Sequence, residues 1–174
     1  MTFSQFLSLL SILGGGVVSA VFVSYLTSHR DLKDYKRKKY EELYEIIRTD
    51  KVKFYDWWIR YQAAFEDSIT LQDAQQGRTS ITDGAERMTK AEMLTNLYAS
   101  DINPLLQEYW KAKQSLIIVV NNMCKERQNG TTTQASMAGF HNARDNVVKA
   151  TEDLFASIAL QSSKLWNVVA RART

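Results

Sequence analysis

The first 28 residues form the most apolar stretch of the chain. No charged side chain occurs between Met1 and Ser28, and the run from Phe6 to Leu26 contains 21 residues. The hydrocarbon core of a bilayer needs roughly 20 helical residues at about 1.5 Å rise each. A cleaved signal peptide is the alternative, but it requires basic residues ahead of its apolar core, and none is present. The pattern therefore predicts an uncleaved transmembrane helix.

Three amphipathic segments follow, and their apolar residues recur at helical spacing. The first extends over about 32–71, the second over about 83–125 and the third over about 134–170, with polar segments at 73–83 and 128–133 between them. The stripe of the first runs through Tyr40, Leu43, Ile47, Phe54, Trp57, Tyr61 and Phe65. That of the second runs through Leu94, Tyr98, Ile102, Leu105, Tyr109, Ala112, Leu116, Val120 and Met123. Phe140, Val147, Ala150, Leu154, Ile158, Leu165 and Val169 mark the third.

These patterns predict an all-α protein. An N-terminal transmembrane helix is followed by an antiparallel bundle of three long helices, because the segments are similar in length and the loops are short. Pro104 lacks a backbone N–H, so the second segment kinks or breaks there. A complete break converts the bundle into one of four helices.

The excess positive charge is concentrated in one segment of the chain. Six basic residues and two acidic residues lie between His29 and Lys39, whereas residues 40–174 carry 16 basic and 17 acidic residues. We therefore assign 1–28 to an anchor, 29–39 to a basic juxtamembrane segment and 40–174 to a helical domain. The basic segment predicts a cytosolic C-terminal domain, an N-terminus outside and contact with lipid headgroups. Its candidate residues are Arg30, Lys33, Lys36, Arg37, Lys38 and Lys39. A nearly neutral domain argues against nucleic-acid binding.

The predicted anchor contains small residues at four-residue intervals, which let two membrane helices approach closely. They form two strips, Ser11, Gly15 and Ser19, and Gly16, Ala20 and Ser24. The spacing predicts pairing of the anchor with itself or with another membrane protein. Chance occurrence in an apolar helix is the competing interpretation.

Tyr44, Tyr55 and Trp58 lie beside the first bundle stripe. Aromatic residues dominate the hot spots of protein interfaces, so these three are a candidate partner surface. The alternative is that they widen the core.

Catalytic patterns are lacking in the sequence. It contains no phosphate-binding loop, dinucleotide fingerprint or nucleophile-elbow motif, and position 138, three residues before His141, is Ala rather than the Glu of a di-iron bundle. We therefore expect no enzyme activity, no metal, no cofactor and no small-molecule substrate.

The leading hypothesis is a single-pass, membrane-anchored helical interaction protein, a scaffold or accessory subunit of a bacterial inner-membrane system. One alternative is a membrane-perturbing effector or pore component whose anchor oligomerises. Another is an outward-facing sensor or spanin-like domain with reversed topology.

Overall fold

The computed structural model describes residues 3–76, 84–131 and 133–171. Side chains are described from Val21 to Lys164, apart from Phe22, Leu26, 77–83 and Thr132. The described chain is all helix and turn: α1 (Phe3–Phe65), α2 (Leu71–Gln76), α3 (Gly84–Tyr98), α4 (Asn103–Gln128) and α5 (Gln134–Arg171). The all-α prediction is confirmed.

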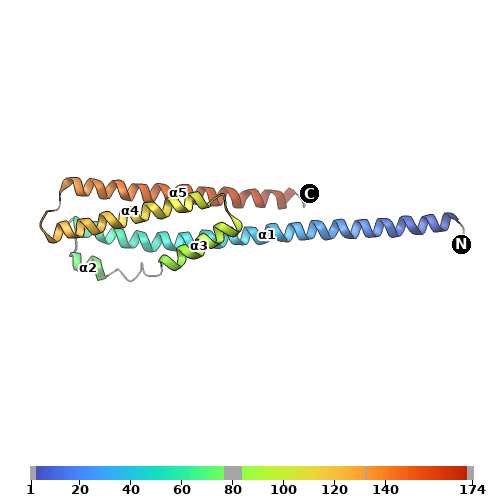
Figure 1. Cartoon of the computed structure of the whole chain (residues 1–174), viewed down its shortest axis with the longest axis horizontal. Coiled ribbons are helices and arrows are strands. Elements are labelled where there is room, and N and C mark those ends of the chain that lie inside the picture. Colours follow the sequence, from blue (N-terminus) through green and yellow to red (C-terminus); the bar gives the residue numbers. More distant parts are fainter. Residues whose placement is uncertain (1–2, 77–83, 132, 172–174) are drawn as a thin grey trace.

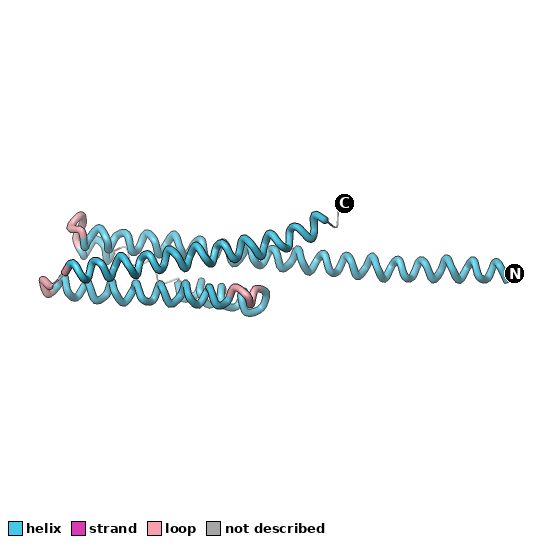
Figure 2. The backbone as a smooth tube through the Cα atoms, turned by 90° about the horizontal axis from the view of Figure 1, so that it is seen from above, coloured by secondary structure: helices cyan, strands magenta, loops and turns pink. Residues whose placement is uncertain are grey.

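Helices α1, α3, α4 and α5 form a four-helix bundle, with the short α2 at the end where α1 stops (Figure 1). Helix α5 packs on α4 and on α1, and α3 packs on α1. The N-terminal part of α1 projects beyond the other helices, and both views show it standing alone (Figures 1 and 2). The bundle begins near Tyr40, which is the first buried residue of α1 among those described.

The predicted second helix is divided in two, so the four-helix alternative is the one observed. Helix α3 ends at Tyr98, and a tight turn follows in which the Ile102 amide donates to the Ala99 carbonyl at 2.9 Å. Pro104 lies in the first turn of α4, where backbone N–H groups have no partner within the helix, so the missing N–H of proline removes no helical hydrogen bond. The break at Pro104 is therefore complete.

The membrane anchor predicted at residues 1–28 is not supported. Within the described residues, no helix is both long enough and apolar enough to cross a membrane. Helix α1 instead continues without interruption through the basic segment into the bundle, and charged residues occur on every turn from Arg30 to Arg60. This finding contradicts the predicted single-pass, inner-membrane placement.

The core is a continuous layer of aromatic and aliphatic side chains between the four helices. Phe140 of α5 is fully buried and contacts two aromatic rings of α1, with centroid distances of 6.4 Å to Trp58 and 5.9 Å to Phe65. Edge-to-face contacts of this kind add to the free energy of burial. Aromatic packing thus holds α5 against the C-terminal half of α1.

Candidate functional site

The most distinctive surface of the bundle lies where α1 and α5 run side by side. We call it the α1–α5 surface. It consists of Tyr40, Tyr44, Lys51 and Tyr55 from α1 and Val148, Phe155, Ile158 and Ser162 from α5. From Tyr40 to Tyr55 it follows α1 for roughly 22 Å at the rise of an α-helix.

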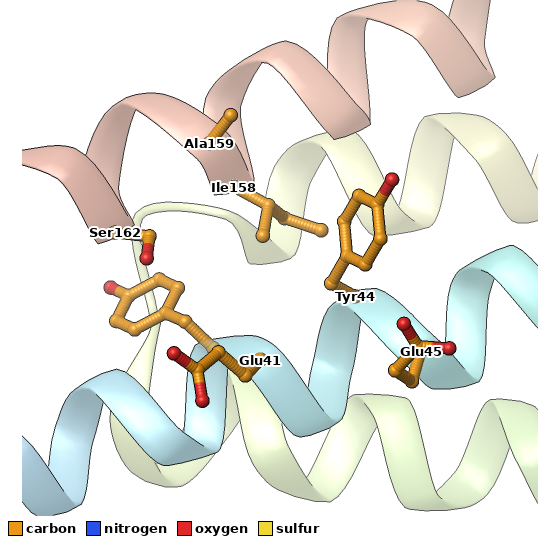
Figure 3. Close-up of a pocket in the computed structure, with 7 residues that line it drawn as sticks. Glu41, Tyr44, Glu45, Ile158, Ala159 and Ser162 are labelled. Atoms are coloured by element: carbon orange, nitrogen blue, oxygen red, sulfur yellow. The ribbon is translucent and has the colours of Figure 1, made fainter.

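An open groove of about 230 Å³ occupies the N-terminal end of this surface. Glu41, Tyr44 and Glu45 come from α1, and Ile158, Ala159 and Ser162 from α5 (Figure 3). Tyr44 remains 39% exposed, although its ring centroid lies 4.9 Å from that of Phe155. The groove therefore has an apolar floor and an acidic rim.

The acidic rim pairs with arginines of α1. Glu41 lies 3.3 Å from Arg37, which is partly buried, and Glu45 lies 3.4 Å from the exposed Arg48. The exposed Glu45–Arg48 pair contributes little to stability, so Glu45 can exchange its partner at small cost.

A second, smaller hollow of about 30 Å³ lies at the other end of the surface, between Tyr55 of α1 and Val148 of α5. Tyr55 is 48% exposed and rests edge-on against Trp58, with ring centroids 4.7 Å apart. Lys51 also lines this hollow, and its ammonium lies 5.4 Å from the Phe155 ring. The surface thus presents two half-exposed tyrosine rings, Tyr44 and Tyr55, each supported by a second aromatic ring.

The predicted partner residues divide between surface and core. Tyr44 and Tyr55 are partly exposed on the α1–α5 surface, whereas Trp58 is only 7% exposed. Its ring packs between Phe140 and the guanidinium of Arg144. Trp58 is therefore a support for Tyr55, and the alternative that the aromatics widen the core holds for it.

The other predicted site residues do not form one site. Of the small-residue strips, only Ser24 has a described side chain, which is exposed; Ser11, Gly15, Gly16, Ser19 and Ala20 lie outside the described side chains.

In the basic segment, the side chains differ in exposure. Arg30, Lys36 and Lys38 are exposed, and Lys33, Arg37 and Lys39 are partly buried. Lys39 donates to Glu42 at 2.9 Å, and Glu42 also pairs with Lys90 of α3 at 2.9 Å. Both bonds hold the pKa of Glu42 below its ordinary value. Part of the basic segment therefore binds the bundle itself.

Beneath the α1–α5 surface lies a buried charged cluster that the sequence patterns did not reveal. Asp50 of α1 is 1% exposed and Lys113 of α4 is 4% exposed. The Lys113 ammonium donates to Oδ2 of Asp50, and the Tyr109 hydroxyl donates to the same oxygen at 2.7 Å. Nε of Arg87, from α3, lies 3.6 Å from Oδ1. One carboxylate thus joins three helices.

Desolvation shifts the pKa of two members of this cluster, Lys113 and Tyr109. Burial lowers the pKa of Lys113, although Asp50 acts in the opposite direction. Burial also raises the pKa of Tyr109, and the Asp50 carboxylate raises it further. The Lys113 ammonium lies 4.7 Å from the ring of Phe54, which compensates part of its lost hydration. The Asp50, Tyr109 and Lys113 side chains are almost completely buried, so none of them is an accessible nucleophile.

One signal in the sequence marks Asp50. The first predicted stripe steps directly from Ile47 to Phe54, and Asp50 lies at the position between them that completes the alternation of three and four. The spacing does not mark Lys113, because Ala112 already fills the interval between Tyr109 and Leu116 in the predicted second stripe. In the structure Lys113 is buried more deeply than Ala112.

The described side chains offer no obvious metal centre, because no three His, Cys, Asp or Glu residues are grouped to hold an ion. No family model, curated protein or solved structure matches the chain. The geometry described above is therefore the only basis for a functional assignment.

Proposed function

We propose that the protein is a non-catalytic helical scaffold or accessory subunit that binds an α-helix of a partner protein on the α1–α5 surface. The observation that carries this proposal is the pair of half-exposed tyrosines, Tyr44 and Tyr55, each packed against a second aromatic ring. Such rings lose little conformational freedom when they are covered, and rigid aromatic residues are frequent hot spots.

The shape of the surface supports a helix as the bound element. Two packed helices leave a shallow trough between them, and amphipathic helices commonly bind in apolar troughs. The length from Tyr40 to Tyr55 matches about four turns of a bound helix.

The rim indicates the character of that helix. Glu41 and Glu45 stand beside the apolar floor at Ile158. The exposed pair of Glu45 with Arg48 is readily exchanged, and the Glu41 carboxylate is itself exposed. Charge complementarity therefore favours a helix whose apolar face is flanked by Lys or Arg.

Site-specific photo-crosslinking in cells tests the proposal. A photoreactive phenylalanine analogue replaces Tyr44 or Tyr55, and matched controls carry it at two exposed apolar positions elsewhere, Leu97 of α3 and Ile118 of α4. We expect one discrete protein to be captured at both tyrosine positions and at neither control position. Mass spectrometry identifies it, and the purified protein must then bind the purified chain. Capture of the same products at all four positions, or none at the tyrosines, contradicts the proposal.

A further inference from the structure

Most buried positions of α1 and all those of α4 lie on two regular seams, which meet across the core because α1 packs mainly on α3 and α5. In each, the interval between consecutive residues alternates between three and four, which is the heptad pattern of packed helices. The α1 seam is Tyr40, Leu43, Ile47, Asp50, Phe54, Trp57, Tyr61 and Ala64, and the α4 seam is Leu106, Tyr109, Lys113, Leu116, Val120 and Met123. Each seam carries one charge, and the two charges are opposite.

A heptad seam does not by itself determine how far two helices are shifted along one another. A slide of seven residues, about 10 Å, places core positions opposite core positions again. Helix α1 continues beyond the bundle at its N-terminal end, so a shift along its axis would still leave α1 residues beside the other helices (Figure 1). The heptad spacing of the seams alone therefore leaves more than one register open.

The charged pair removes this ambiguity. In the observed register, Lys113 reaches Asp50, which also accepts the hydroxyl of Tyr109. After a slide of one heptad, Asp50 would face an apolar seam residue such as Val120. Both charges would then be buried without a partner, which is strongly unfavourable in a low-dielectric core.

We propose that the Asp50–Lys113 pair is a register lock, a conformational device that selects one alignment of α1 against α4. Arg87 extends the lock to α3, because its guanidinium approaches the second oxygen of Asp50. This inference concerns the bundle itself and is independent of the proposed function.

The lock also determines the form of the α1–α5 surface. Phe54 and Tyr109 both contact the Lys113 ammonium, with centroid distances of 4.7 Å and 5.3 Å. The same two residues line the smaller hollow beside Tyr55. A change of register would therefore move Tyr109 of α4 away from this hollow, although Tyr55 would keep its contact with Trp58 of the same helix.

The test is a distance measurement between α1 and α4 in the full chain. Spin labels are attached to cysteines at the exposed positions Val52 and Ile118, with Cys124→Ser to remove the natural thiol. Asp50→Leu, Tyr109→Phe and Lys113→Met are then combined to give an apolar variant. Pulsed electron resonance should report one distance in the labelled parent and two populations in the apolar variant, related by a slide of about 10 Å.

The matched control replaces a different buried polar group. Thr95 of α3 is fully buried, but its hydroxyl donates only to the Glu92 carbonyl of its own helix, at 3.0 Å. Thr95→Val should retain the single parental distance. One unshifted distance in the apolar variant overturns the proposal.

A second variant decides the point if the apolar variant does not melt cooperatively. Lys113→Val with Val120→Lys moves the lysine by one heptad and leaves Asp50 in place. A register lock predicts one distance, displaced from that of the parent. An undisplaced distance in this variant contradicts it.

Discussion

Replacement of Asp50 by alanine is the substitution to which the bundle should be most sensitive. It removes the carboxylate that accepts hydrogen bonds from Lys113 and Tyr109 and lies beside Arg87. Lys113 is left in the core with its charge uncompensated, because its side chain is almost completely buried.

The expected loss follows from the burial of the pair. Breaking a buried ion pair by removing one partner costs about 3–5 kcal/mol. For a chain of this size, that corresponds to a fall in Tm of about 6–20 °C. Lys113 can limit the loss by releasing its proton, since burial already lowers its pKa. A lysine whose folded pKa lies below its unfolded value binds fewer protons when folded, so the stability of Asp50→Ala should rise as the pH approaches 10.5.

Urea denaturation followed by circular dichroism measures this effect, and Asp56→Ala is the matched control. Asp56 is on the same helix, but it is exposed and pairs with Arg60 at the surface, at 3.4 Å. We expect the control to change the free energy of unfolding by no more than about 0.5 kcal/mol. Lys113→Met added to Asp50→Ala should recover much of the loss, because it removes the unpaired charge. If Asp50→Ala unfolds within about 1 kcal/mol of the control, which is well below the buried-pair range, the reasoning is refuted.

Three further predictions concern the core, the pH dependence and the turn between α4 and α5. Phe140→Ala should destabilise the chain by about 3–5 kcal/mol in the same urea assay, because it deletes a fully buried ring that joins α5 to α1. Tyr109→Phe should reduce the loss of stability that occurs above about pH 10. The raised pKa keeps the Tyr109 phenol protonated in the folded chain while the phenol of the unfolded chain ionises. Its contribution to stability is therefore complete below pH 10.0 and declines as the pH rises. If the free energy of unfolding falls equally steeply with pH in the wild type and in Tyr109→Phe, this assignment is disproved. Gly130→Ala should lower the free energy of unfolding by about 1–2 kcal/mol, because Gly130 has φ +69°. Gly139→Ala, within α5, should raise the free energy of unfolding by about 0.5–1 kcal/mol. Calorimetric Tm values that move in the same direction for both variants would contradict this contrast.

Periodicity predicted the helices because each buries one face. The stripe from Tyr40 to Phe65 is indeed the core face of α1, and all seven of its predicted members are buried. Pro104 marked the position of the α3–α4 turn, but a single proline is compatible with either a kink or a break. The outcome depends on the contacts of the residues around it, such as the bond from Asn103 to Asn96 at 3.0 Å.

Residue type alone could not separate surface from core among the aromatics. Tyr55 and Trp58 are three residues apart on one helix, and only the position of Phe140 on a distant helix decides that Trp58 is covered. The charged cluster was missed for a related reason. A pattern search that admits only apolar residues passes over Asp50 and Lys113, although both lie on the seams. Their partnership depends on the mutual position of two helices, which local spacing does not contain.

The partner-binding claim is tested most directly by an affinity measurement with the protein captured at Tyr44 and Tyr55. Isothermal titration of that protein against the wild-type chain, Tyr55→Ala and Leu97→Ala compares the α1–α5 surface with an exposed apolar position on α3. A hot-spot tyrosine predicts a loss of about 2 kcal/mol, or roughly 30-fold in Kd, for Tyr55→Ala and an unchanged Kd for Leu97→Ala. Wild-type affinity in Tyr55→Ala, or an equal loss in both variants, contradicts binding on the α1–α5 surface.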